Sequence, residues 1–160
     1  MTELSPSARR VQEALRALNL NTEVVELPGS TRTAQDAAAT LGCGVAQIAK
    51  SLVFRSAGGE AVITLLSGAH RASEARLSAL LGEGVSKADA RFVREQTGFA
   101  VGGVPPFGHI RPLTTFLDDA LLSFPEVFAA GGTPHAVVRL TPDDLRRLPG
   151  VRIVTVREET

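Results

Sequence analysis

Apolar residues are distributed along this chain in two patterns, and each pattern predicts a different secondary structure. After Ser5-Pro6, a typical helix start, apolar residues recur every three or four positions as far as Leu18. Three further helices are predicted from a start signal at Thr33 and from glycines suited to helix C-terminal ends, Gly42, Gly82 and Gly98. Helices are therefore predicted at residues 6–18, 33–41, 73–81 and 88–96, with a shorter one from residue 141.

Nearly continuous apolar runs predict two central strands, at 50–55 and 61–66. The residues between them, Ser-Ala-Gly-Gly-Glu, predict a hairpin and hence antiparallel pairing. Further strands are predicted at 22–27, 99–101, 113–117, 126–129, 135–140 and 152–156. Hairpins combined with helical crossovers indicate an α/β (α+β) fold, with a mixed, barrel-like β-sheet flanked by short helices. No linker or repeat divides the chain, so residues 1–160 are predicted to form a single domain.

Composition narrows the classes of function. Lys+Arg and Asp+Glu each number 17, so the formal net charge is +0 and the pI is about 6.8. This balance argues against a large surface that follows nucleic-acid phosphates, and no DNA-binding role is expected. Seven Phe with no Trp or Tyr supply few platforms for stacking single-stranded bases. A small contact with one end of a nucleic acid remains compatible with these numbers.

Cysteine content and the length of apolar runs bear on the compartment. A lone cysteine, Cys43, rules out an intramolecular disulfide and fits the reducing cytoplasm. The three histidines show no zinc-site spacing, and neither a metal nor another cofactor is expected. No apolar run approaches the roughly 18 residues that a membrane helix needs, so the protein is expected to be cytoplasmic.

Lysine is rare in this chain, and one lysine opens its most apolar strand. The 17 Lys+Arg residues include only two lysines, Lys50 and Lys87, so arginine is the usual surface cation here. A lysine ammonium is a compact charge with three donors, suited to a phosphate or a developing oxyanion. Lys50 is therefore a candidate anion-binding residue, with a solvated ion pair at the strand end as the alternative. Lys87, in a polar connector, is predicted to be simply exposed.

A loop rich in glycine and proline, at 102–109, is the second candidate feature. Gly102 and Gly103 would let a ligand approach the backbone without interference from side chains. Pro105 and its neighbouring proline stiffen the loop, which would preorganise those backbone groups. His109 closes the loop. The alternative interpretation is a tight surface turn.

Other residues that could carry chemistry have structural alternatives. Cys43 follows a helix C-terminus, where a thiolate is disfavoured, so a buried and unreactive thiol is predicted. His70 is either a base or an exposed residue at a helix entry, and His135 is interpreted as structural. Asp118 and Asp119 are adjacent and do not face one another, which favours a helix cap over a paired acid/base site. No standard hydrolase, nucleotide-binding or metalloprotease motif occurs.

Four segments resemble the YbaK / prolyl-tRNA synthetase-associated editing-domain family in order and spacing. They are TAQDAAATLGCGVAQIAKSLVF (33–54), AVITLLSGAHR (61–71), TGFAVGGVPPFGH (97–109) and GTPHAVVRLTPDDL (132–145). The resemblance covers nearly the whole chain. It implies a compact α/β domain with a mixed, barrel-like sheet, and it implies hydrolysis of mischarged aminoacyl-tRNA by a free-standing, trans-acting protein.

The resemblance also implies roles for particular residues. Lys50 matches a lysine that holds the phosphate or ester end of the tRNA terminus. Gly102 and Gly103 match a glycine loop whose backbone positions the terminal adenosine and the ester. The specificity-determining region corresponds to Gly131, Gly132 and Thr133. The remaining predicted substrate-binding residues are Ser51, Ser67, His70, Pro105 and His109.

The amino acid that would be removed stays open at this stage. Family members that deacylate Ala-tRNA carry a histidine in the specificity region, but here the nearest one, His135, is offset. The serine of cysteine-selective members is replaced by Ala129-Ala130.

The chemistry needed for such a reaction is modest, because an aminoacyl ester is already activated. Positioning, a water molecule and charge stabilisation suffice, with the water activated by the ribose hydroxyl or by His109. The sequence thus predicts a trans-acting editing hydrolase that binds the tRNA acceptor end, on tRNA-Pro or a related tRNA, with prolyl-tRNA synthetase as a candidate partner. The alternatives are a non-catalytic module that binds the tRNA end or an amino acid and associates with a synthetase, and a small-molecule esterase.

Overall fold

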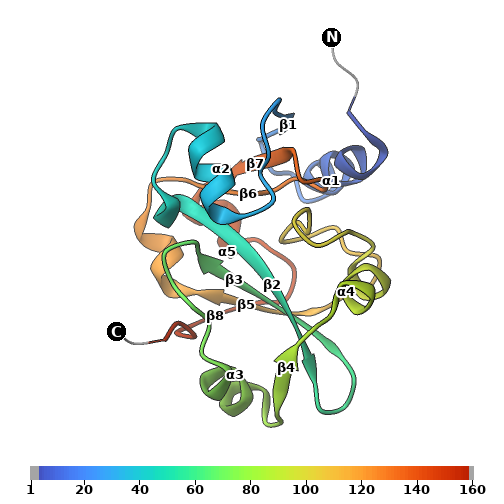
Figure 1. Cartoon of the computed structure of the whole chain (residues 1–160), viewed down its shortest axis with the longest axis vertical. Helices are drawn as coiled ribbons and strands as arrows, with labels where there is room; N and C mark the ends of the chain where they lie inside the picture. The colour runs from blue at the N-terminus through green and yellow to red at the C-terminus, as the bar shows by residue number, and fades with distance from the viewer. Residues whose placement is uncertain (1–3, 159–160) are drawn as a thin grey trace.

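In the computed structural model, which describes residues 4–158, eight strands join in one mixed sheet (Figure 1). The sheet order is β1-β7-β6-β2-β3-β5-β8, and β4 pairs with β2 beside this path. The strands are β1 (Val24–Glu26), β2 (Ile48–Ser56), β3 (Ala61–Ser67), β4 (Val85–Lys87), β5 (Thr114–Asp118), β6 (Val127–Ala130), β7 (Ala136–Leu140) and β8 (Val151–Val154). The mixed α/β sheet flanked by short helices is confirmed; the outermost residues of the predicted 1–160 domain lie outside the described part.

Five α-helices flank the sheet in the described part of the chain. They are α1 (Pro6–Ala17), α2 (Ala34–Leu41), α3 (Glu74–Leu81), α4 (Ala90–Thr97) and α5 (Pro142–Arg146), with 3-10 turns at Val45–Gln47 and Asp119–Ser123. The predicted C-terminal glycines are confirmed, because Gly42, Gly82 and Gly98 each follow a helix in the left-handed conformation. None of the helices within residues 4–158 is both long enough and apolar enough to cross a membrane.

The β2–β3 hairpin forms the centre of the sheet, as its apolar pattern predicts. The strands are antiparallel in a register that pairs Lys50 with Leu66, and every residue of β3 is buried. Because side chains alternate across a strand, β3 serves two cores. Ile63 and Leu65 pack into the larger core, shared with α1, and Leu66 packs into the smaller one beneath α3.

Two predictions about strands are wrong, and both errors arise from tertiary context. Residues 99–101 form a turn rather than a strand, in which the Gly103 N–H donates to the Ala100 carbonyl and Phe99 is buried in the larger core. Residues 85–87, taken as a polar connector, form β4 against Phe54–Ser56 of β2. Such a short polar strand has no apolar alternation, so only its pairing reveals it.

The outer edge of β2 is interrupted, and this gap positions the site. Parallel pairing with β6 involves only Ile48 and Ala49, and pairing with β4 begins at Phe54. The Val53 carbonyl accepts a hydrogen bond from Ala88, so its backbone groups point away from β3. The direction of these backbone groups alternates from one residue to the next, so residues two apart point the same way. The N–H and C=O of Ser51, two residues before Val53, therefore also face the open edge.

Candidate functional site

Two adjoining cavities meet at the open edge of β2. The larger lobe has a volume of about 390 Å³ and the smaller lobe about 230 Å³. The residues that line both lobes are Lys50, Ser51, Leu52, Val101, Gly102 and Val104. The two lobes therefore form one continuous site, with β2 on one side and the glycine loop on the other.

Lys50 lies where the two lobes join, and it is half-buried. None of the ion pairs among residues 4–158 includes it, so the strand-end ion pair considered from the sequence does not form. Partial burial removes water from the ammonium and lowers the pKa of Lys50, and the nearby positive charge of Arg71 lowers this pKa further. A cation held this way, without a protein counter-ion, favours an anionic ligand.

The larger lobe contains further charges that the sequence reasoning did not single out. Arg71 and Lys87 join Lys50 in its lining, together with the carboxylates of Glu74 and Glu158. Arg71 is the last residue of the segment 61–71 quoted for the resemblance, directly after His70, and this position was the available signal. The lining carries one positive charge in excess, three against two, which suits a phosphate or a sugar-phosphate group.

The smaller lobe is mostly apolar but contains two hydroxyl groups without partners. Thr31 is 6% exposed, and neither its Oγ1 nor the Oγ of Ser51 forms a hydrogen bond with any group in the described part of the chain. The surrounding lining includes Ile48, Ala129 and Val137. A buried hydroxyl without a partner is unfavourable, so these two groups are available to a ligand with polar atoms.

The two glycines of the loop have different positions. Gly102 has φ +91°, lines both lobes and lies against Arg32, whose Cγ would be 2.6 Å from an added Cβ. Gly103 is buried and packs on a second loop, because an added Cβ would lie 2.9 Å from the Thr133 backbone. The glycine at 103 is thus explained by close packing of two backbones, whereas Gly102 borders the site.

The second glycine pair, Gly131 and Gly132, is also closely packed against neighbouring backbone. An added Cβ at Gly131 would lie 3.0 Å from Ala136, and Gly132, with φ +106°, lies against the backbone of Ser7 in α1. Gly131, Gly132 and Thr133 line neither lobe, although Ala129 and Ala130 just before them line the smaller one.

Four other predicted substrate-binding residues also lie outside the lining of the two lobes. The Ser67 hydroxyl donates to the Ala46 carbonyl at 2.7 Å, which fixes the end of β3. His109 Nε2 donates to the Pro105 carbonyl at 2.7 Å, and burial lowers the pKa of His109. His70 is half-buried, and its Nδ1 has no partner within residues 4–158.

The other candidate residues from the sequence, Cys43 and His135, line neither lobe. Cys43 is half-buried, and desolvation raises its pKa, in accord with the predicted unreactive thiol. His135 is exposed, and its Nδ1 lies 3.0 Å from the Gly29 carbonyl. No group of three or more His, Cys, Asp or Glu side chains within residues 4–158 is placed to hold a metal ion.

Asp118 caps the turn at Asp119–Ser123, as predicted, and also anchors the C-terminal segment. Its carboxylate is fully buried and accepts from the Ala120 N–H. It also accepts from the Val156 N–H at 2.8 Å, the Arg157 N–H at 3.2 Å and the Arg157 guanidinium at 3.0 Å. This segment pairs with the chain beside Arg71, and its Glu158 lines the larger lobe. Asp118 thus supports one wall of the site from below.

The family is decided by comparison with known proteins. The model of the aminoacyl-tRNA editing domain family matches residues 29–148, which include the open edge of β2 and both glycine loops. The chain belongs to this family. A crystal structure of a candidate trans-editing enzyme for prolyl-tRNA synthetase is 49% identical to the editing domain, with a TM-score of 0.91, and covers 98% of this chain and 100% of its own.

Two further proteins are similar to the editing domain. The crystal structure of the hypothetical protein APE2540 is 31% identical, with a TM-score of 0.87, over 93% of this chain and 99% of its own. YwhH of Bacillus subtilis (strain 168), an uncharacterized protein, is 32% identical over 139 residues, 87% of this chain and 88% of its own.

Proposed function

We propose that this editing domain hydrolyses the ester of mischarged aminoacyl-tRNA, acting in trans on tRNA-Pro or a related tRNA. The single observation that carries the proposal is Lys50, a half-buried cation without a carboxylate partner at the junction of two lobes. An aminoacyl-tRNA terminus has the matching parts: a phosphate, a ribose ester and a small side chain. The similarity to a candidate trans-editing enzyme for prolyl-tRNA synthetase supports that synthetase as the partner.

The terminal nucleotide is assigned to the larger lobe. Its phosphate would contact Lys50 and Arg71, two cations that favour the same anion. The backbone of Gly102 borders both lobes, so the ribose can approach it without meeting a side chain.

The amino acid is assigned to the smaller lobe. Its apolar walls accept a short side chain, and its volume of about 230 Å³ limits the size that fits. The unpartnered hydroxyls of Thr31 and Ser51 would accept hydrogen bonds from the α-ammonium group. Small apolar differences between amino acids change binding by only about 1–3 kcal/mol, so exclusion of larger residues by size is the expected basis of selectivity.

The reaction itself requires little from the protein. A water oxygen attacks the ester carbonyl, the bond to the ribose oxygen breaks, and a proton from the water passes to that ribose oxygen. The Lys50 ammonium and the outward N–H of Ser51 are the donors assigned to the developing oxyanion. His109 lines neither lobe, so the vicinal ribose hydroxyl is the assigned proton carrier rather than this imidazole.

The test is a deacylation panel. Pure protein is incubated with tRNA-Pro charged with Ala, Ser, Cys or Pro, and loss of labelled amino acid is measured. We expect rapid loss for at least one small non-cognate amino acid and none for Pro. If binding is measurable but no charged tRNA loses its label faster than in buffer, the non-catalytic alternative replaces the proposal.

Two variants give this test its mechanistic resolution. Lys50→Arg keeps the charge but alters its shape, and we expect deacylation to fall about tenfold or more because a planar fork cannot occupy the ammonium position. Arg146→Ala, which removes an exposed ion-paired cation of α5 that lines neither lobe, is the control and should retain full activity. Full activity in Lys50→Arg would show that charge alone suffices.

A further inference from the structure

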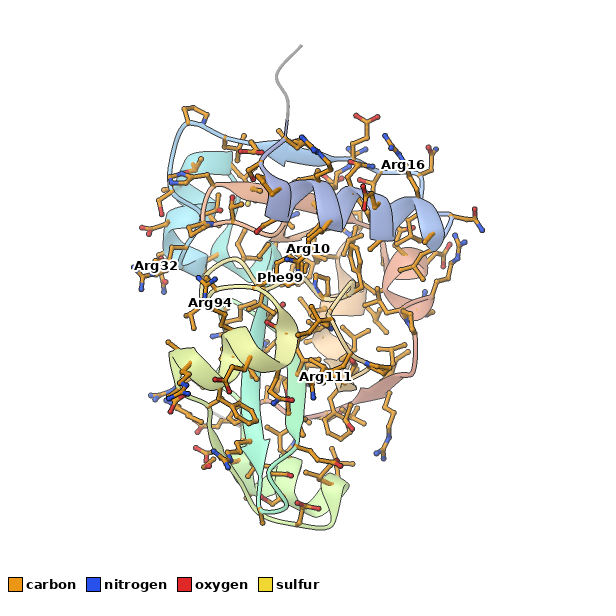
Figure 2. All side chains as sticks on the ribbon, turned by 90° about the vertical axis from the view of Figure 1, so that its right-hand side faces the viewer. Arg10, Arg16, Arg32, Arg94, Phe99 and Arg111 are labelled. Atoms are coloured by element: carbon orange, nitrogen blue, oxygen red, sulfur yellow. The ribbon has the colours of Figure 1, made fainter. Side chains whose placement is uncertain are left out.

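The neutral net charge conceals that some arginines of this protein pair with carboxylates and others do not. Several arginines within residues 4–158 form ion pairs with carboxylates, among them Arg91, Arg139, Arg146 and Arg157. A second group of exposed arginines enters none of these ion pairs and lies on one side of the molecule (Figure 2). We call this group the arginine face; it consists of Arg10, Arg16, Arg32, Arg94 and Arg111.

Arg10 is at the centre of the arginine face and is held in place. Its guanidinium donates to the Gly98 carbonyl at 3.0 Å and lies 4.4 Å from the centre of the Phe99 ring. These contacts join α1 to the end of α4, which also carries Arg94. A guanidinium stacked on a ring has little conformational freedom left, so it is preorganised to receive an anion on its outer side.

The arginine face begins at the mouth of the site. Arg32 lines the smaller lobe and packs against Gly102, which lines the larger lobe as well. Val101, the neighbour of Gly102 in sequence, also lines both lobes and is 46% exposed. Figure 2 shows Arg32 at one border of this side, then Arg94 and Arg10, with Arg16 at the far end of α1. A chain that leaves the lobes in this direction would meet one cation after another.

We propose that the arginine face binds the phosphate backbone of the double-stranded acceptor arm of tRNA. The proposal rests on the proposed function for the identity of the ligand in the lobes. The affinity of the arginine face for RNA can nevertheless be measured by itself. The proposal differs from the expectation, drawn from the net charge, that no extended phosphate-binding surface exists.

A duplex fits this surface better than a single strand. Gripping a single strand relies on stacking bases against aromatic rings, and no Phe in the described part of the chain is classed as exposed. Phe99, the ring nearest the centre of the face, is 1% exposed and covered by Arg10. Exposed arginines with no exposed ring beside them can contact phosphates but cannot stack bases on a ring, and contacts to phosphates are how helical RNA is recognised by shape.

The first experiment measures binding of uncharged RNA as a function of salt. A hairpin that carries an acceptor stem and a single-stranded CCA end is compared with a CCA-ended single strand. We expect tighter binding of the hairpin. In Arg10→Gln and Arg94→Gln, hairpin affinity should fall about three- to tenfold, and the slope of log affinity against log salt should decrease by about one.

Arg152 provides a matched control for Arg10. It is exposed, enters no ion pair within residues 4–158 and stacks on Phe116 at 5.0 Å, but it lies on β8 at the other end of the sheet. Arg152→Gln should leave both the affinity and the salt slope unchanged. An equal loss in Arg152→Gln, or unchanged hairpin binding in Arg10→Gln and Arg94→Gln, would overturn the proposal.

The second experiment separates the arginine face from the lobes. Deacylation of full-length aminoacyl-tRNA is compared with deacylation of the corresponding aminoacyl-CCA trinucleotide. Arg10→Gln and Arg94→Gln should lower kcat/KM for the tRNA about three- to tenfold and leave the trinucleotide rate unchanged, which also excludes misfolding. Equal losses on both substrates would contradict the proposal. If the unaltered protein hydrolyses neither substrate, the proposed function fails. The salt dependence of hairpin binding then still decides whether the arginine face binds RNA.

Discussion

Asp118 at the end of β5 and Lys50 on β2 are charged residues of one sheet, separated by β3, and their surroundings differ in opposite ways. Asp118 is fully buried and accepts four hydrogen bonds, three of them from the C-terminal segment. Lys50 is half-buried and has no carboxylate partner in the described part of the chain. A buried charge with complete partners stabilises structure, whereas one left without them marks a place for a ligand.

The same contrast extends to neutral groups. Thr97 is fully buried, and its hydroxyl hydrogen-bonds with Val93 and Phe99 of its own chain. Thr31 is almost as buried, yet its hydroxyl has no partner within residues 4–158. The region around β2 thus retains unsatisfied polar groups of several kinds, and natural proteins tolerate such groups mainly where function requires them.

The largest effect should come from removing Lys50. Lys50→Met should lower kcat/KM for deacylation by about 100-fold or more, because the anionic part of the substrate loses its buried cation. The free energy of unfolding should not fall, since a poorly solvated charge is replaced by an apolar side chain of similar length. Single-turnover kinetics and urea denaturation measure the two effects. A large loss of stability would show that Lys50 is structural, like Asp118.

Removing Asp118 should have the opposite profile. Asp118→Ala leaves the Val156 and Arg157 amides without their acceptor, and we expect the free energy of unfolding to fall by about 3–5 kcal/mol. Asp119→Ala, which removes an exposed partner of Arg157, is the control and should lose no more than about 1 kcal/mol. Urea denaturation compares the two, and equal effects would refute the special position of Asp118.

Gly103→Ala tests the packing between the two glycine loops. The new Cβ would lie 2.9 Å from the Thr133 backbone, so overpacking should lower the free energy of unfolding by about 1–3 kcal/mol. Gly84→Ala, at a glycine with open space around it and without positive φ, should change stability by less than about 0.5 kcal/mol. Thermal denaturation of both variants decides whether Gly103 is required for packing.

A smaller effect is expected at Thr31. Thr31→Val removes an unpartnered hydroxyl without changing the shape of the side chain, so the stability of the protein should be unchanged or slightly higher. The KM for the charged tRNA should rise about threefold to tenfold, because the α-ammonium group loses an acceptor. Unchanged kinetics would remove Thr31 from the proposed amino-acid pocket.

The smallest effect is a dependence of stability on pH. Lys50 has one pKa in the folded protein and another in the unfolded protein. At pH values below both, the side chain is charged in both states, and the folded state bears the full desolvation penalty. The folded pKa is lowered, so as pH rises from it towards the unfolded value of about 10.4, the folded protein loses its proton first. The unaltered protein should therefore gain stability relative to Lys50→Met over this window. Denaturation curves at several alkaline pH values measure this difference, and a constant difference would contradict it.

Sequence alone predicted the features that depend on local pattern. The β2–β3 hairpin follows from two apolar runs around a glycine turn, and the ends of three helices follow from Gly42, Gly82 and Gly98. Lys50 was singled out by the rarity of lysine and its place before a buried strand.

Features created by tertiary pairing were not predictable in this way. The short polar strand β4 exists because β2 offers it an edge, and Phe99 is buried in a turn because α1 covers it. Likewise Asp118 and Arg157 are 39 residues apart, and the sequence around each residue gives no sign that their side chains form a hydrogen bond. A net charge of zero likewise gives no sign that the arginines of the arginine face lie on one side of the molecule.

The anchoring of Val156–Glu158 has a practical consequence for work on this protein. This segment supplies Glu158 to the larger lobe, and its backbone pairs with the chain beside Arg71. Proteolysis after Leu148, or a shortened expression product that stops before Val156, would therefore remove a wall of the cavity together with two of the three backbone amides that Asp118 binds. Purification handles and immobilisation chemistry are better placed at the opposite terminus, and loss of ligand binding on storage should first prompt a mass measurement of this end.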